Sequence, residues 1–287
     1  MPKTLYHYCS LETLLTILKS KTIRLSDLRK MQDSCERSWV WRRMEPLLKD
    51  AYSKLDALDT PERSLKALEH ITEYWESWLL PGGAYSEYAL CLSEKRDLLS
   101  QWRGFADDGH GVSIGYNVGV LRLLEGKKCF SLKSIDYSFD ELKIKEKVEQ
   151  LLKYLQTDFL LTREDALEVD GMLDLMAVAN YMFVKNPAFI EEAEWRLVFQ
   201  PNYAKDNERE KSFTYKEFGI KSLQHRATRD KIVGYHDIDV SGYLDSLISS
   251  ITVGPKCRAT YIDIMEMTYA LGYSGIEYFA SEATYCS

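Results

Sequence analysis

One short segment, Phe189–Leu197, concentrates carboxylates next to a cation. If the chain is extended from Glu192 onwards, Glu192, Glu194 and Arg196 share one face, because side chains alternate along a strand. A carboxylate held on such a face can stabilise a developing positive charge. An ion pair between Glu194 and Arg196 on an edge strand, or a solvated acidic turn, explains the same residues without catalysis.

A histidine lies on the first expected strand, a β-like run from Leu5 to Tyr8. There, Tyr6 and Tyr8 face one way and His7 faces the other. An imidazole in this position can donate a hydrogen bond to a ligand hydroxyl, and the structural alternative is a half-buried histidine bonded to the backbone. Ser10 follows where a helix N-cap is expected.

An aromatic pair follows the polar segment that begins at Ser93. Trp102 and Phe105 are three residues apart, so they share one face of a helix that Asp97 can cap. Such a pair offers ring faces to a ligand, although packing in the core is the more common use of this spacing.

Two familiar cofactor patterns are not supported by the sequence. The glycines of Gly109–Gly115 follow a helix and precede a strand, whereas a dinucleotide fingerprint needs a strand first and a helix second. The six cysteines and five histidines lack the spacing of zinc ligands, so we expect no metal.

The elements that must hold these residues alternate between short strands and amphipathic helices without a regular βαβ repeat, which favours an α+β fold. The strands are expected at 5–8, 22–25, 88–92, 112–116, 130–137, 194–199, 248–253 and 276–279. The helices are expected from Leu11, over 36–80 with a break at 60–61, over 98–105, 139–160 and 163–184, and over 261–271. Residues 81–83 are expected to form a loop. We expect one domain, 1–287, with helix-rich insertions at about 36–80 and 139–185.

Composition narrows the class of protein. Lys and Arg number 37 against 44 Asp and Glu, so the net charge of −7 argues against a protein whose main task is to neutralise phosphate backbones. The hydrophobic share of 45% excludes a disordered or collagen-like chain. The apolar runs are too short to span a bilayer, and the first eight residues do not resemble a signal peptide. We therefore expect a cytoplasmic protein without a membrane partner.

Taken in order, these motifs resemble the DUF2971 family of bacterial proteins, from Leu5 to about Val253. The resemblance rests on Tyr6–Tyr8 with Ser10 and the leucine-rich helix, Ile23–Ser26, Met31–Glu36, Leu92–Glu94 with Trp102, and Glu192–Arg196. The chain departs from the family pattern at Gln32–Ser34, where an Asn-Asp-Pro turn is usual, and at Phe105, where a tyrosine is common.

More distantly, the layout is similar to that of ADP-ribosyltransferases. A histidine on the first strand, a hydroxyl residue three positions later, and a late Glu-x-Glu, here Glu192-Ala193-Glu194, carry this resemblance. It implies a central split or mixed β-sheet of short strands, with NAD as the substrate and no bound cofactor. The acceptor would be a protein, a nucleic acid or a small molecule, in a setting of defence or of a toxin.

The resemblance also implies roles for the site residues. Glu194 would accept a hydrogen bond from a ribose hydroxyl and stabilise an oxocarbenium-like transition state, with Glu192 as the next candidate. His7 would hold a ribose hydroxyl, assisted by Ser10, and Tyr8 or Trp102 would offer a ring to nicotinamide or adenine. The substrate-contacting residues expected are Tyr8, Ser10, Arg24, Ser93, Trp102, Phe105 and Arg196.

Two other classes of function remain open at this point. A non-catalytic binding or interaction module on the same fold would use the segment from Glu192 to Arg196 to hold its structure. A nuclease or another nucleic-acid-processing protein would need paired metal-binding carboxylates or a basic stripe, which the sequence does not provide.

Overall fold

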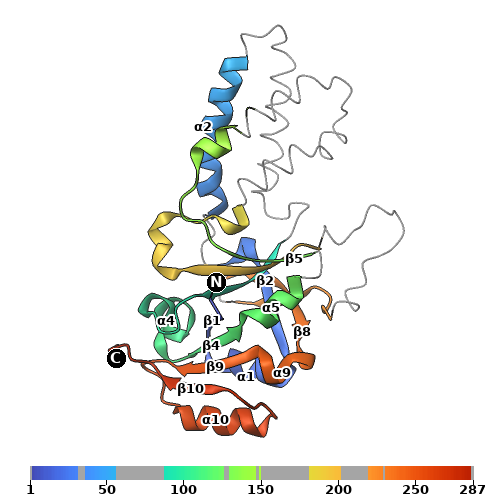
Figure 1. Ribbon diagram of the computed structural model, residues 1–287, viewed down its shortest axis with the longest axis vertical. Helices are drawn as coiled ribbons and strands as arrows, with labels where there is room; N and C mark the ends of the chain where they lie inside the picture. Colours follow the sequence, from blue (N-terminus) through green and yellow to red (C-terminus); the bar gives the residue numbers. More distant parts are fainter. Residues whose placement is uncertain are drawn as a thin grey trace, which may run out of the picture. The chain divides into compact units, whose positions relative to one another are not determined.

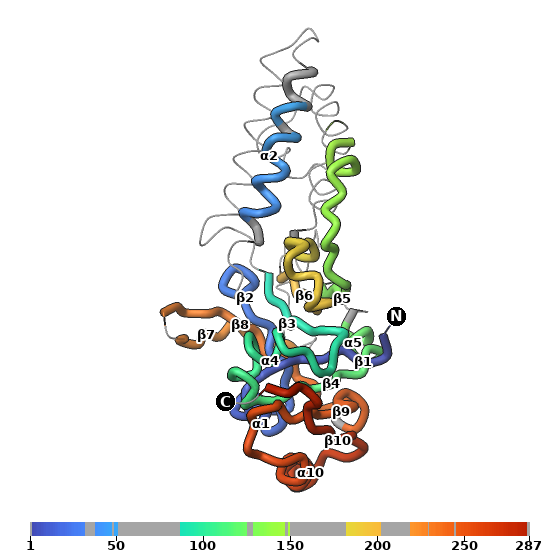
Figure 2. Tube along the Cα trace, turned by 90° about the vertical axis from the view of Figure 1, so that its left-hand side faces the viewer, coloured from blue at the N-terminus to red at the C-terminus, as the bar shows by residue number. Residues whose placement is uncertain are grey.

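A computed structural model describes residues 2–31, 36–55, 87–125, 129–146, 149, 181–201, 219–228 and 230–285. The chain divides into two compact units (Figures 1 and 2). The first unit comprises Met1–Met31, Ser86–Ile135 and Ile190–Ser287, and the second comprises Gln32–Tyr85 and Asp136–Phe189. Both stretches in which the sequence predicted helix-rich insertions, 36–80 and 139–185, fall within the second unit.

The strands are β1 (Thr4–Cys9), β2 (Thr22–Asp27), β3 (Tyr88–Ser93), β4 (Val112–Asn117), β5 (Phe130–Ser134), β6 (Glu194–Phe199), β7 (Gln224–Ala227), β8 (Ile232–Asp239), β9 (Ile248–Val253) and β10 (Glu277–Ala280). The α-helices are α1 (Leu11–Ser20), α2 (Glu36–Leu55), α4 (Leu99–Phe105), α5 (Val118–Glu125), α9 (Leu244–Leu247) and α10 (Tyr261–Ala270). Short 3-10 turns are η1 (Leu28–Lys30), η2 (Asp107–Gly109), η3 (Tyr181–Phe183), η4 (Pro187–Glu192) and η7 (Ser241–Tyr243).

The strands form one mixed sheet in the order β10-β9-β4-β1-β3-β2-β8-β7, and β6 pairs with β3 and β5 outside this path. The described pairs of strands are antiparallel except β9 and β10, which are parallel. This architecture confirms the α+β class and the mixed sheet of short strands that the sequence predicted.

The sheet splits at β3. One edge of β3 pairs with β6 along its whole length, from Tyr88 to Ser93. The opposite edge is shared, because β1 pairs with it only at Ser93 and β2 pairs with it only at Tyr88 and Ala89. Residues 90–92 lie between these two contacts, so β1 and β2 diverge from this middle part of β3.

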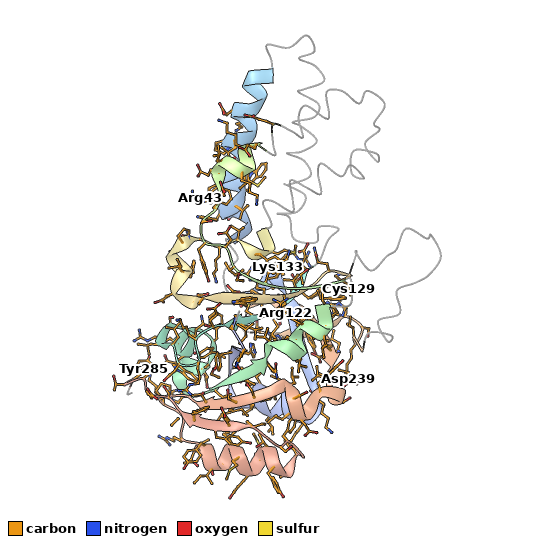
Figure 3. The ribbon with its side chains drawn as sticks, viewed as in Figure 1. Arg43, Arg122, Cys129, Lys133, Asp239 and Tyr285 are labelled. Carbon is orange, nitrogen blue, oxygen red and sulfur yellow. The ribbon has the colours of Figure 1, made fainter. Side chains whose placement is uncertain are left out.

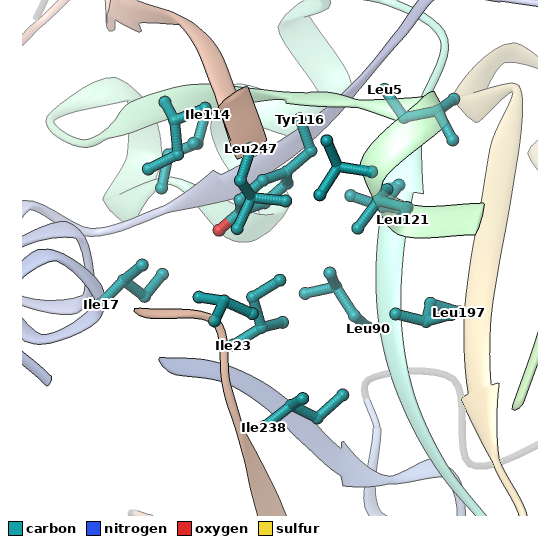
Figure 4. Close-up of a cluster of buried hydrophobic side chains, with 14 of the residues drawn as sticks. Leu5, Ile17, Ile23, Leu90, Ile114, Tyr116, Leu121, Leu197, Ile238 and Leu247 are labelled. Atoms are coloured by element: carbon teal, nitrogen blue, oxygen red, sulfur yellow. The ribbon is translucent and has the colours of Figure 1, made fainter. Parts of the chain in front are cut away.

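One face of the sheet carries the hydrophobic core (Figure 4). Helix α1 packs on it because Leu14, Ile17 and Leu18 lie on one side of the helix, where they meet Leu5 and Ile114 of the strands. Further apolar side chains come from α5, α9 and α10. We call this side the core face.

We call the opposite side of the sheet the polar face. Successive side chains of each strand point in turn to the core face and to the polar face. On β3 it carries Cys91 and Ser93, and on β6 it carries Glu194 and Arg196, which are their partners across the two strands. Helix α4 covers this face at β1, where Trp102 packs on Tyr8.

In the second unit, α2 runs through Pro46 and contacts η3. The Arg43 guanidinium lies over the Trp39 ring and pairs with Glu141 at 3.2 Å (Figure 3). These contacts join α2 to the helical segment at 141–146.

The predicted strands around residues 5–8, 22–25, 88–92, 112–116, 194–199, 248–253 and 276–279 are confirmed within one or two residues at most ends. The strand predicted over 130–137 ends at Ser134, and the sequence did not predict β7 and β8. The helix-capping role of Asp97 was predicted wrongly, because Leu98 precedes α4 and makes no side-chain cap. The predictions for 56–80, 81–83 and 151–180 concern residues outside the described part.

Candidate functional site

The predicted carboxylate Glu194 forms a buried ion pair with Arg196. The Glu194 Oε1 atom accepts from the Arg196 Nε at 2.7 Å, and Oε2 accepts from Nη2 at 3.2 Å. Only 5% of Glu194 and 2% of Arg196 is exposed. The ion pair that the sequence offered as an alternative is therefore present, but its expected place on an edge strand is wrong, because β6 lies between β3 and β5. The pair is buried rather than solvated.

The second glutamate of the motif, Glu192, does not share this strand. It ends the 3-10 turn η4, and Ala193 then adopts a left-handed conformation with φ of 43°. The extended conformation that the sequence predicted from Glu192 onwards begins at Glu194. The main-chain oxygen of Glu192 accepts a 2.6 Å hydrogen bond from the Ser93 hydroxyl, which fixes the turn against β3.

His7 lies in the split of the sheet. Its Nδ1 atom is 3.0 Å from the main-chain oxygen of Cys91, a residue in the part of β3 that neither β1 nor β2 covers. A carbonyl only accepts, so Nδ1 carries the proton and Nε2 keeps its lone pair. Burial lowers the pKa of His7 from its usual value, against the opposing effect of the Cys91 hydrogen bond. His7 is thus a neutral imidazole that would accept from a ligand hydroxyl through Nε2 rather than donate to it.

Tyr8 and Trp102 form one aromatic unit on the polar face. Their rings meet edge to face with centroids 4.8 Å apart, and Trp102 is fully buried. The Tyr8 hydroxyl donates to the Lys95 oxygen at 2.8 Å and accepts from the Leu98 amide at 3.0 Å. Burial raises the pKa of Tyr8, so the phenol stays protonated. In this state both rings support the loop before α4.

The other predicted contact residues lie apart from this unit. Ser10 caps α1, because its Oγ accepts from the Thr13 amide at 3.1 Å. Arg24 forms a two-point ion pair with Asp237 on β8. Phe105 is 41% exposed at the end of α4.

The sequence did not identify the importance of the loop 94–98. The Glu94 carboxylate accepts from the Trp195 indole at 2.7 Å, which ties this loop to β6 beside Glu194. Asp97 accepts from the Trp102 indole at 2.6 Å and from the Ser281 hydroxyl at 2.6 Å. The loop therefore connects β1, β6 and the C-terminal segment. In the sequence, the acidic residues after Ser93 are the one signal of these contacts.

That C-terminal segment continues along the outside of η2. The Tyr285 hydroxyl donates to Asp108 at 2.7 Å, and Lys256 lies over the Tyr285 ring while it pairs with the same carboxylate at 2.8 Å (Figure 3). The segment after β10 is thus attached at both Asp97 and Asp108.

The strand registers decide which of the predicted residues meet. Ser93 lies across from Tyr6 on one side and from Glu194 on the other, so these three share the polar face. Arg24 is on the same face, because its neighbours Ile23 and Leu25 belong to the core. The polar face thereby gathers the predicted residues Tyr8, Arg24, Ser93, Glu194 and Arg196.

His7 is placed differently. It lies across from Ile114, on the core side of β1, whereas Glu194 is on the polar face. His7 and Glu194 therefore lie on opposite faces of the sheet, on the strands that flank β3. A ligand that touches both side chains would have to reach both faces.

Within the described ranges, no three His, Cys, Asp or Glu residues lie together as a metal site requires. In that same part of the chain, no helix combines the length and the apolar character that crossing a membrane requires.

A family model described as a protein of unknown function, DUF2971, matches residues 101–197. This stretch begins within α4, includes β4, α5 and β5, and ends within β6. This match supports the resemblance to that family. No curated protein and no solved structure matches the chain.

Proposed function

We propose that this protein cleaves the bond between nicotinamide and ribose in NAD and transfers ADP-ribose to an acceptor or to water. The observation that carries the proposal is the split at β3, with a neutral imidazole, His7, in it and a buried carboxylate, Glu194, on the strand at the other edge of β3. This combination matches the residue types that the reaction uses.

The chemistry assigns a separate task to each group. The C1′–N bond breaks and its electron pair leaves with nicotinamide, so positive charge develops on the ribose. The Glu194 carboxylate stabilises this charge, and the His7 Nε2 accepts from a ribose hydroxyl. A nucleophile on the acceptor then bonds to C1′ and releases its proton to solvent, which balances the step.

The pairing of Glu194 constrains access to its carboxylate. Both carboxylate oxygens accept hydrogen bonds from Arg196. The Glu194 side chain is 6% exposed, so a ribose reaches it only after the groups that cover it move. Substrate binding is therefore expected to open the polar face.

Release of nicotinamide tests the proposal. The wild-type protein is incubated with NAD alone and with protein, DNA, RNA and small-molecule acceptors, and nicotinamide is quantified by mass spectrometry. We expect release by the wild type and by Glu266→Gln, which makes the same change on an exposed residue of α10, but not by Glu194→Gln. Background release in every mixture, together with no NAD binding by calorimetry, would refute the proposal.

A second candidate, a non-catalytic interaction module, is favoured by the pairing of Glu194. Both carboxylate oxygens bond to Arg196, and the hydroxyls of Tyr8 and Ser93 are also used within the chain. In this case NAD is not consumed, and Glu194→Gln changes stability alone.

A further inference from the structure

Arg24 is fixed on the polar face beside the split. Its Nε and Nη2 atoms donate to the two oxygens of Asp237 at 2.9 and 3.3 Å. The guanidinium also lies 3.7 Å from the centre of the Tyr235 ring. About a third of the side chain is exposed, and its Nη1 atom has no partner among the described residues. Arg24 therefore presents an oriented, unused pair of donors to solvent.

A second arginine, Arg226 on β7, lies on the same face of the sheet. Arg226 lies across from Val233 on β8, two residues before Tyr235, so its side chain emerges on the same face as Tyr235 and Asp237. Arg226 is exposed and has no partner in the part of the chain that the structure describes. Partial burial, and after it the charge of Arg24, lowers the pKa of Arg226 from its usual value.

The Tyr235 ring is held in place. The Tyr235 hydroxyl donates to Gln224 at 3.2 Å, and only 9% of the residue is exposed. The three strands involved, β2, β8 and β7, lie side by side in the sheet. The cluster is thus anchored to rigid backbone rather than to a loop.

The charges of this cluster do not cancel. Arg24 and Arg226 contribute two positive charges and Asp237 contributes one negative charge, so one positive charge is left over. Two guanidinium groups on one face of the sheet are well suited to a ligand that carries more than one negative charge. Arginine binds phosphate oxygens through pairs of parallel N–H donors, which a fixed guanidinium presents without further ordering.

We propose that Arg24 and Arg226, positioned by Tyr235 and Asp237, form a binding site for a phosphate-bearing ligand on strands β2, β8 and β7. The ligand phosphate accepts from Nη1 of Arg24 and from the Arg226 guanidinium. The phosphate belongs either to a free nucleotide or to a nucleic-acid backbone. This site goes beyond the proposed function, because its occupancy is measured without any cleavage of NAD.

The test is calorimetric titration of the full chain with inorganic pyrophosphate, ADP-ribose and a short single-stranded oligonucleotide. Arg226→Gln removes the guanidinium group, and Arg226→Lys keeps the positive charge but lacks the pair of parallel N–H donors. Lys231→Gln is the matched control, because it removes the same charge from an exposed position in the same hairpin. Thermal melting verifies that each variant is folded.

We expect the wild type and Lys231→Gln to bind pyrophosphate alike, Arg226→Gln to bind it about tenfold more weakly or worse, and Arg226→Lys to fall between them. Tighter binding of ADP-ribose identifies a nucleotide as the ligand, and tighter binding of the oligonucleotide identifies a nucleic-acid backbone. The site is refuted if the wild type binds none of the three probes, or if Lys231→Gln weakens binding as much as Arg226→Gln does.

Discussion

Glu194→Gln tests whether the buried ion pair supports the fold as well as the proposed reaction. The change keeps the size of the side chain but removes the negative charge of Glu194 from the Arg196 guanidinium, which is 2% exposed. Removing one partner of a buried pair costs about 3–5 kcal/mol, whereas an exposed pair contributes about 1 kcal/mol or less. We therefore expect the free energy of unfolding to fall by about 3–5 kcal/mol, a large share of the 5–15 kcal/mol typical of a folded protein.

Urea unfolding followed by tryptophan fluorescence measures this loss. A double-mutant cycle with Arg196→Met then separates the pair from other effects of each substitution. The double variant lacks both charges of the pair. Its loss in the free energy of unfolding should therefore be smaller than the sum of the losses of the two single variants, by about 0.5–3 kcal/mol. If Glu194→Gln unfolds at the same urea concentration as the wild type, the reasoning from burial is refuted.

The same cycle distinguishes catalysis from structure. If Glu194 stabilises the transition state, every variant that lacks it should lose about 100- to 1000-fold in the rate of nicotinamide release, including a double variant that remains folded. A folded double variant that cleaves NAD at the wild-type rate would assign Glu194 a structural role only.

Three further predictions concern the sheet and its attachments. The pKa of His7 is near 6.5 in the unfolded chain and lower in the folded one, so the free energy of unfolding should fall as the pH drops below about 6.5. In urea titrations at several pH values, His7→Asn should make the dependence of the unfolding free energy on pH shallower by up to about 1.4 kcal/mol per pH unit. His236, whose pKa is also lowered, should keep its own contribution to this dependence. Asp97→Asn sets an amide NH2 group against groups that donate hydrogen bonds to Asp97, and it should lower the free energy of unfolding by about 1.5–3 kcal/mol. Limited proteolysis should then cut the C-terminal segment faster than in the wild type. An unchanged cleavage rate would contradict the attachment of this segment at Asp97. Gly111→Ala sets a Cβ 2.1 Å from the Cys9 carbonyl oxygen and should lower the free energy of unfolding by at least about 1–3 kcal/mol; an unchanged melting temperature would show that the backbone yields at this contact.

The parts of the fold that depend on local signals could be read from the sequence. The first helix is an example, since Ser10 caps it and Leu14 and Leu18 lie on its buried side. Strand β8 was missed because Gly234 and two aspartates interrupt its apolar residues. β8 lies between β2 and β7 in the sheet. The position of a strand among distant neighbours cannot be predicted from its local sequence pattern.

The site illustrates the same limit. The sequence predicted that Glu194 and Arg196 share a strand face, which the structure confirms, but it could not show that β6 lies inside the sheet. The alternation of Tyr8 and His7 was also predicted correctly. Tyr8 shares a face of the sheet with Glu194, whereas His7 lies on the other face. This arrangement depends on the register of β1, β3 and β6, which is set by residues far apart in the chain.

The strand order also has a consequence for biosynthesis. Arg24 and Asp237 face each other across 213 positions, so β2 obtains its neighbour β8 only when most of the chain has been made. Pairings of such long sequence separation fold slowly, because a large loop must close before any contact stabilises it. During translation one edge of β2 therefore remains without its partner strand until about residue 239 has left the ribosome, and chains truncated before this point should aggregate rather than fold.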